Sequence, residues 1–564
     1  MTEVSATTRT TAEAYLQALA ARGVRRMFVN AGTDFAPIVE GYLRLREEGA
    51  TIPEVVVCAH ENLAVGMAHG AYLGDGGPQV VMLHTNVGTA NAVCGALNAG
   101  HARIPILLVA GRSPVFEAGP TGARDSVIHW AQEMYDQAGM LREAVKWDYE
   151  LRGSEQLHAV LDRAWELATA EPQGPVYLTL PREVLAQPIV STSGPTTTSS
   201  PSPTHPDPEA IERLADLLAG AVFPVIVTSW TGADPATVAV LNEISDRYAI
   251  GVIEDHPRYV NAAADLPLHL GYAVDTALKH ADVLCVTDVD VPWVPGKTCP
   301  ADHTVVVQTG PAPLFGAIPM RSHRSDFSIT AANLPLLTAL RDALAARAPQ
   351  IDPARRDRLS AVAEQRRTLL PGLASQATDG PIDKTFLNLA LREVRPAGSV
   401  LVNEYWARPD LLPSEVGGYF GTPPVGGLGW GLPAALGLQM ARPDDVVIAA
   451  VGDGAYLFAN PAACHQVMRR YDLPVLTIVC SNGRWEGVRS ATLSVYPAGL
   501  SATEDSGNPF AELAPLPDFE AYARASGGWG VRVSERSQLA DALREAVRVV
   551  SVERRHALVN VLCA

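Results

Sequence analysis

Short apolar runs alternate with amphipathic stretches along the first 190 residues of the chain. Uninterrupted apolar runs are typical of strands covered on both faces in a parallel sheet, and apolar positions three or four residues apart are typical of helices. The pattern predicts helices at residues 12–21 and 63–73, and strands at residues 27–29, 55–57, 80–83, 106–110 and 176–180. This alternation predicts a layered α/β domain with a mostly parallel sheet.

The same alternation returns twice further along the chain. Strands are expected at residues 224–227, 251–253, 283–286, 304–307, 446–451 and 475–480. A Ser-, Thr- and Pro-rich stretch has the composition of a linker, and a later charged stretch has a helical pattern. We therefore expect an α/β fold with three doubly wound parallel-sheet domains. The expected boundaries are 1–190, linker 191–208, 209–348, connecting segment 349–380, and 381–564.

The third unit contains a strand, loop, helix, strand and loop in succession. Its first strand ends on Gly452-Asp453-Gly454 and its second on Ser481-Asn482-Gly483. Parallel strands joined by a helix place their carboxyl ends together, so Asp453 and Asn482 should meet. Their oxygens suit Mg²⁺, and the glycines and the helix start suit a diphosphate. The alternative is a tight turn, which is how we interpret the second copy, Gly74-Asp75-Gly76.

Composition limits the classes of function. The net charge is −17 and no basic patch stands out, which argues against nucleic acid or an anionic membrane as a partner. Seven cysteines lie scattered without C-x-x-C spacing, which favours reduced thiols over a disulfide framework or a zinc site. We see no signal-peptide pattern and no apolar run of membrane-spanning length. These features predict a cytoplasmic protein.

The Gly-Asp-Gly turn with its later Asn resembles the signature of thiamine diphosphate-dependent enzymes of the acetolactate synthase and benzoylformate decarboxylase group. The resemblance implies that Mg²⁺ is bound by Asp453, by Asn482 and by the backbone carbonyl of Arg484. It also implies cofactor contacts at Gly454 and Ala455, where the helix begins. Thiamine diphosphate and Mg²⁺ are therefore the expected cofactors.

Two further segments extend the resemblance. Residues 60–72 are similar to the family helix that begins with the cofactor-activating glutamate, here Glu61. Its carboxyl would hydrogen-bond the aminopyrimidine ring. Without that pattern, Glu61 would be a helix-start charge favoured by the dipole. Residues 426–435 nearly reproduce the segment in which Gly426 contacts the pyrimidine and Leu428 holds the cofactor bent.

The resemblance also implies catalytic and substrate residues, each with a structural alternative. His84 matches the active-site histidine of benzoylformate decarboxylase and would move protons, or it is a hydrogen-bonded structural residue. Thr33 stands where that enzyme has a substrate-contacting serine, or it caps the following helix. Gln132 and Trp485 are weaker substrate candidates, the alternatives being a surface helix and simple packing.

The middle unit departs from the family in two ways. Benzoylformate decarboxylase has a second catalytic histidine in the neighbourhood that corresponds to residues 288–293, and this segment contains none. Acetolactate synthases hold FAD in this domain, but residues 229–232 make a poor glycine-rich turn. FAD is therefore an additional cofactor that the sequence does not support.

Over the whole chain the resemblance implies pyrimidine-binding, central and diphosphate-binding domains, with active sites at the subunit interfaces of a homodimer or homotetramer. We expect decarboxylation of a 2-oxo acid. The missing histidine favours carboligation to a second carbonyl, as in acetolactate synthase, over release of an aldehyde. A non-catalytic thiamine diphosphate-binding subunit is a third hypothesis, against which Glu61, Asp453 and Asn482 together argue. Residues 493–517 are expected to form a mobile lid.

Overall fold

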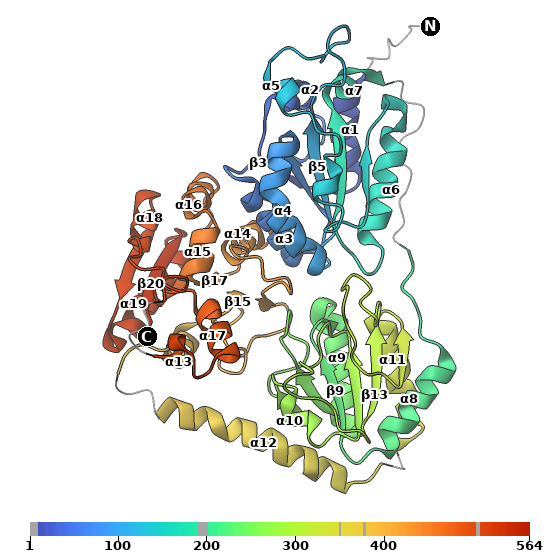
Figure 1. The fold of residues 1–564 in the computed structure, drawn as a ribbon, viewed down its shortest axis with the longest axis vertical. Helices are drawn as coiled ribbons and strands as arrows, with labels where there is room; N and C mark the ends of the chain where they lie inside the picture. Colours follow the sequence, from blue (N-terminus) through green and yellow to red (C-terminus); the bar gives the residue numbers. More distant parts are fainter. Residues whose placement is uncertain (1–8, 190–200, 349–350, 376–379, 504–507, 564) are drawn as a thin grey trace.

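The computed structural model describes residues 9–189, 201–348, 351–375, 380–503 and 508–563, which form three layered α/β bodies (Figure 1). Within these residues each body contains one six-stranded sheet whose neighbouring strands are all parallel. The predicted fold class, α/β with three doubly wound parallel-sheet domains, is confirmed. Parts of the expected linker, connecting segment and lid lie outside the described residues, namely 190–200, 349–350, 376–379 and 504–507.

The first body uses the chain up to Ile189. Its elements are β1 (Arg9–Thr10), α1 (Thr11–Ala21), β2 (Arg26–Val29), η1 (Thr33–Phe35), α2 (Ala36–Glu47), β3 (Glu54–Val57), α3 (Glu61–Asp75), β4 (Gln79–Leu83), α4 (Thr85–His101), β5 (Ile106–Arg112), α5 (Ile128–Ala131), η2 (Ala138–Met140), β6 (Asp148–Glu150), η3 (Ser154–Gln156), α6 (Leu157–Thr169), β7 (Val176–Pro181), α7 (Arg182–Ala186) and β8 (Pro188–Ile189). The sheet order is β3-β2-β4-β5-β7-β6. Met27 and Phe28 point into different apolar clusters, so helices cover both faces of the sheet.

The central body repeats this plan. Its elements are α8 (Pro208–Gly220), β9 (Pro224–Thr228), η4 (Thr231–Ala233), α9 (Pro235–Tyr248), β10 (Gly251–Glu254), β11 (His269–Gly271), α10 (Asp275–Leu278), β12 (Val283–Thr287), β13 (Val305–Gly310), β14 (Phe327–Thr330) and α11 (Asn333–Ala345). The sheet order is β11-β10-β9-β12-β13-β14, so the order reverses between β9 and β12. Ligands of such sheets bind at the carboxyl ends of the strands beside this point.

The third body carries the Gly-Asp-Gly motif. Its elements are α13 (Lys384–Val394), β15 (Val400–Glu404), β16 (Tyr419–Gly421), α14 (Gly431–Ala441), β17 (Val447–Gly452), α15 (Asp453–Phe458), α16 (Pro461–Arg470), β18 (Leu476–Ser481), α17 (Glu486–Val495), η6 (Leu500–Ala502), α18 (Phe519–Ala525), β19 (Trp529–Val533), α19 (Arg536–Ser551) and β20 (Ala557–Leu562). The sheet order is β16-β15-β17-β18-β20-β19. Strands β17 and β18 are adjacent, as the sequence predicts.

Helices α3 and α14 join the first and third bodies and lie side by side (Figure 1). A Cβ atom added at Gly70 would lie 1.8 Å from the carbonyl oxygen of Ala434, and one added at Gly437 would lie 1.8 Å from that of Met67. The two backbones therefore approach more closely than any larger residue permits. One buried apolar cluster runs through both bodies at this contact.

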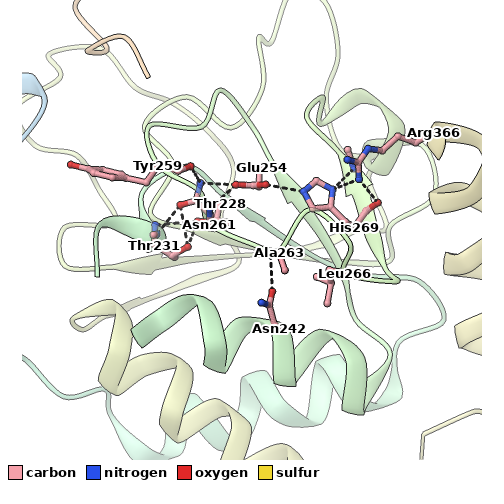
Figure 2. Close-up of polar contacts among 12 residues, drawn as sticks. Thr228, Thr231, Asn242, Glu254, Tyr259, Asn261, Ala263, Leu266, His269 and Arg366 are labelled. Carbon is pink, nitrogen blue, oxygen red and sulfur yellow. Dashed lines mark hydrogen bonds and ion pairs between the residues drawn. The ribbon is translucent and has the colours of Figure 1, made fainter. Parts of the chain in front are cut away.

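The connecting helix α12 (Ala354–Ser375) packs on the central body. Figure 2 shows how Arg366 of this helix donates to Nδ1 and to the carbonyl of His269. Nδ1 of His269 therefore accepts, and its Nε2–H donates to Glu254 at 2.8 Å. The other oxygen of Glu254 accepts from the backbone and side-chain nitrogens of Asn261. This buried network anchors α12 to β10 and β11.

The helices of the described residues include none that combines the length and the apolar character needed to cross a lipid bilayer.

The contact between α3 and α14 predicts that Gly70→Ala destabilises the protein by about 1–3 kcal/mol, because the new methyl group must push the helices apart. Urea unfolding measures the effect as a lower midpoint. Gly220→Ala is the matched control, since Gly220 also lies in a helix and a Cβ there meets no atom within 4 Å. Equal midpoints for the two variants would contradict this account of the contact.

Candidate active site

Asp453 links the carboxyl ends of β17 and β18. Its Oδ1 accepts a hydrogen bond from its neighbour Gly454 N at 2.8 Å, and its Oδ2 accepts from Asn482 N at 3.0 Å and from Gly483 N at 2.7 Å. The Asn482 side chain turns back and accepts from Arg484 N at 3.1 Å. The acid and the amide expected to meet are therefore adjacent.

The donor set of this loop fits a hard divalent cation. Burial raises the pKa of Asp453, and the three backbone N–H groups oppose this by stabilising the carboxylate. A carboxylate, an amide oxygen and a backbone carbonyl are the ligands that Mg²⁺ takes together with phosphate oxygens and water. Among the described residues no group of three or more His, Cys, Asp or Glu side chains could hold a metal, so this mixed oxygen set is the candidate.

The two Gly-Asp-Gly copies differ in structure. Gly76 has a φ of +69° and caps the end of α3, so the first copy ends a helix, with Gly74 and Asp75 in its last turn, where a tight turn was expected from the sequence. In the second copy the Trp485 ring lies against Gly454, where an added Cβ would be 2.2 Å from a ring carbon. Trp485 also packs edge-on against Phe458, with ring centroids 5.7 Å apart. Trp485 is therefore at least a packing residue that forms a wall of the Asp453 loop.

Gly426, the first residue of the segment 426–431, lines a cleft of about 620 Å³ between the central and third bodies. The hydroxyl of Tyr405 donates to the Gly426 carbonyl at 3.3 Å, and Leu428 packs half-buried on the cluster shared by the first and third bodies. Asn98 of α4 holds Gly427 from both sides, donating to its carbonyl and accepting from its N–H. The segment is thus fixed by both the first and the third body.

His84 follows β4 and lies between Asp34 and Gln132. Its Nδ1 is hydrogen-bonded to Asp34 Oδ1, and its Nε2 lies 3.2 Å from Gln132 Nε2. The acid acceptor makes Nδ1 a donor. The Gln132 amide can present either its N–H or its oxygen to Nε2, so both protonation states of His84 keep two partners.

The surroundings of His84 favour its protonated form. The hydrogen bond that His84 donates to Asp34 raises the pKa of His84, and the Glu61 charge adds to this against the opposing effect of burial. Two glycines make the room: a Cβ on Gly32 would lie 2.0 Å from the His84 ring, and one on Gly111 would lie 1.6 Å from Asp34 Oδ2. Any side chain at either position would displace the pair.

Glu61 is the first residue of α3 and is 9% exposed. Asn91 of α4 donates to its Oε2 at 3.0 Å, and Gly88 lies against its Oε1. The first body therefore gathers Glu61, His84 and their partners, whereas Asp453 and Asn482 belong to the third body. Thr33 is exposed, and neither η1 nor α2 is capped by a side chain, so the capping alternative for Thr33 is not realised.

Two residues in this region were not found from the sequence. Asp34 lies in the turn after β2, and the pairing of β2 with β4 brings it to His84. His323 lies in the loop before β14 and bonds the Trp293 carbonyl through Nε2 at 2.8 Å. A histidine thus stands beside residues 288–293 after all, supplied by a different loop. The available signal for Asp34 was an acidic residue in the short segment after β2, next to the candidate Thr33.

Comparison with known proteins places both bodies in one family. The family model for the N-terminal TPP binding domain of thiamine pyrophosphate enzymes matches residues 9–140, and the model for the C-terminal TPP binding domain matches residues 405–561. Benzoylformate decarboxylase of Pseudomonas aeruginosa is 27% identical over 96% of this chain and 97% of the relative. The large subunit of acetolactate synthase isozyme 3 of Escherichia coli is 24% identical over 96% of this chain and 93% of the relative.

Solved structures show the same fold over the whole chain. The thiamine diphosphate-dependent 4-hydroxybenzoylformate decarboxylase of Rhodococcus jostii superposes with a TM-score of 0.77 at 20% identity, covering 98% of this chain and 99% of that one. Benzoylformate decarboxylase of Polynucleobacter necessarius gives a TM-score of 0.78 at 19% identity, covering 98% and 99%. At these identities the likeness concerns the fold.

The hydrogen bonds of Asp453 predict that Asp453→Asn loosens the two strand ends. Asparagine has one acceptor oxygen, so its NH₂ group faces an N–H donor and about 1–3 kcal/mol of local stability is lost. Hydrogen exchange should become faster at the amides of Asn482 and Gly483. The exposed Asp444→Asn is the control. Unchanged exchange at residues 482–483 would show that the carboxylate does not hold this loop.

Proposed function

This chain belongs to the thiamine pyrophosphate enzymes of the decarboxylase and acetolactate synthase group, and we propose that it decarboxylates a 2-oxo acid and releases the aldehyde. The observation that carries the proposal is the Asp34–His84–Gln132 arrangement, which is built to hold and deliver a proton. The sequence alone favoured carboligation, whereas the arrangement around His84 favours release of an aldehyde.

The cofactor residues are proposed from the fit of their donors. Asp453, Asn482 and the Arg484 carbonyl would hold Mg²⁺, and through it the diphosphate. The N–H groups at the start of α15, from Gly454 and Ala455, would face the same phosphates. In the loop 426–431, the Gly426 carbonyl and the Leu428 side chain would contact the pyrimidine and the bend of the cofactor. We assign no role to FAD, because buried Trp230 occupies the turn after β9.

Thiamine diphosphate, when bound, supplies the electron sink that takes the bonding electrons as the carboxylate leaves as carbon dioxide. Glu61 would hydrogen-bond the pyrimidine nitrogen. His84 would give the proton of Nε2 to the carbon that has lost the carboxylate, while Asp34 keeps Nδ1–H in place. Thr33 and Gln132 would contact the substrate carboxylate, with Trp485 closing one wall. His84 is partly exposed, which allows solvent to return its proton.

A site at a subunit interface is supported by the distribution of the candidate residues between the first and third bodies. The described hydrogen bond of Glu61 stays within the first body, and those of Asp453 stay within the third. Family members are typically oligomeric, and we propose a homodimer or homotetramer in which the first body of one subunit faces the third body of another. The site is then complete only in the assembly.

Carboligation is the second candidate function, since acetolactate synthases are among the relatives. Its original support was the histidine missing from residues 288–293. His323 contacts the Trp293 carbonyl from another loop, so a histidine does lie beside this segment. Burial lowers the pKa of His323, so this imidazole would be neutral at working pH and would not itself donate a proton.

The direct test supplies the purified protein with thiamine diphosphate, Mg²⁺ and a panel of aliphatic and aromatic 2-oxo acids. We expect carbon dioxide release, and mass spectrometry should find the matching aldehyde as the main product. Acyloins or acetohydroxy acids as main products would overturn the decarboxylase assignment in favour of carboligation. Cofactor binding without carbon dioxide release from any acid would identify a non-catalytic subunit.

Chelation of Mg²⁺ should abolish turnover reversibly. Glu61→Gln should also abolish turnover while the exposed Glu47→Gln does not.

The Asp34–His84 pair predicts a change in pH dependence. If His84 acts as the proton donor, kcat falls as pH rises through its raised pKa. Asp34→Asn removes the charge that raises this pKa, so the alkaline limb of the kcat profile should move to lower pH. The exposed Asp541→Asn should leave the profile in place. An alkaline limb that does not move in Asp34→Asn would remove Asp34 from the proton transfer.

A further inference from the structure

Glu404 is a buried acid that no step above uses. It is the last residue of β15, and its side chain is completely buried. Its Oε1 accepts from Gly429 N at 2.8 Å and its Oε2 from Gly431 N at 2.7 Å. In the described part of the chain no lysine, arginine or histidine is hydrogen-bonded to it. Its partners are instead the backbone of the loop 426–431.

We propose that Glu404 is a positioning residue whose ionised carboxylate holds the loop 426–431 in its cofactor-binding conformation, so that cofactor affinity depends on the protonation of this one side chain. The proposal rests on the proposed function in one respect, that the loop contacts thiamine diphosphate through Gly426 and Leu428.

The geometry requires two acceptors. Both carboxylate oxygens point at N–H donors, and a carboxylate can satisfy both because it has no hydrogen of its own. A protonated carboxyl or a glutamine side chain offers one acceptor and one donor. The donor would then face the N–H of Gly429 or Gly431, and that half of the loop must move.

Asn98 and Tyr405 hold the first part of the loop, at Gly427 and Gly426, and Glu404 holds the second part. Gly429 has a φ of +84°, and Gly431 is the first residue of α14, so the carboxylate satisfies one of the free N–H groups at this helix start. Helix α14 itself is held by α3. Glu404 therefore holds the part of the chain that connects Gly427 to this fixed helix.

The surroundings of Glu404 place its titration near neutral pH. Burial raises the pKa of Glu404 to about 7, although the N–H groups of Gly431, Gly429 and Trp430 lower it. The titratable groups that respond to its charge are Cys94 on α4 and Tyr405 beside it. Burial and then Glu404 raise the pKa of each, so both are neutral in this range and neither offers a counter-charge.

Ionisation of Glu404 has opposite effects on the free energy of folding and on the hydrogen bonding of the loop 426–431. The pKa of Glu404 in the folded protein lies above the ordinary 4.5, so its ionisation costs folding free energy as pH rises between these values. As pH rises through this same range, Glu404 loses its proton, and both of its oxygens can then accept hydrogen bonds from the loop 426–431. Loss of the charge should therefore weaken cofactor binding without lowering overall stability.

The binding test measures the Kd of thiamine diphosphate with Mg²⁺ between pH 6 and 8. Wild type should bind about tenfold more weakly at pH 6 than at pH 8, beyond any pH effect from the diphosphate, because one proton competes at a pKa near 7. E404Q should bind weakly throughout and show only the pH effect of the diphosphate. The exposed Glu393→Gln should behave as wild type. E404Q binding as tightly as wild type at pH 8 would overturn the proposal.

A second measurement needs no cofactor. Hydrogen exchange of the amides in the loop 426–431, corrected for the intrinsic rate, should be faster in E404Q at pH 8 and faster in wild type at pH 6 than at pH 8. E404D, which keeps two acceptors, should recover part of the protection. If wild type never binds thiamine diphosphate, the proposed function fails while this measurement still decides the role of Glu404. Loop exchange that is independent of both pH and substitution would overturn it.

Discussion

Helices α3 and α14 lie backbone against backbone, and this contact determines how the first and third bodies face each other. It exists because Gly70 and Gly437 have no Cβ where the carbonyls of Ala434 and Met67 stand. Each helix starts at a candidate cofactor segment: α3 begins at Glu61, and α14 follows the loop 426–431. Close packing in protein interiors tolerates little adjustment. The glycines that permit this helix contact therefore also fix the position of Glu61 relative to the loop 426–431.

The candidate chemistry lies at the carboxyl ends of strands. His84 follows β4, Asp453 follows β17, and Asn482 follows β18. Parallel sheets place these ends along one edge, where helix starts offer free N–H groups. The first body thus presents a proton-handling group, and the third presents oxygen ligands beside glycine-rich backbone. Neither body alone contains both, so the site that we propose needs a first body and a third body together.

Three buried acids are treated differently by their surroundings. Asp34 faces an imidazole and so raises the pKa of its partner. Asp453 and Glu404 face backbone N–H groups, which stabilise a negative charge without supplying a positive one. Burial raises the pKa of both acids, and the N–H groups offset this only in part. The metal binding that we propose at Asp453 and the proton uptake that we propose at Glu404 both depend on this arrangement.

The sequence was sufficient for the fold class and for the pairing of Asp453 with Asn482. Strand and helix periodicities are local, and a helix between two parallel strands leaves little choice about where their ends lie. It also pointed to His84 and Glu61 through resemblance, and its expected boundaries placed them in a different domain from Asp453 and Asn482.

Tertiary structure decided the partners of these residues. Asp34 meets His84 because β2 lies next to β4, His323 reaches Trp293 from another loop, and Glu404 finds the N–H groups of a loop more than twenty residues later. Such contacts follow from the order of strands and the packing of side chains. The local alternation of polar and apolar residues predicts neither the strand order nor the packing. That alternation determines which face of an element is buried, but it does not determine which residues that face packs against.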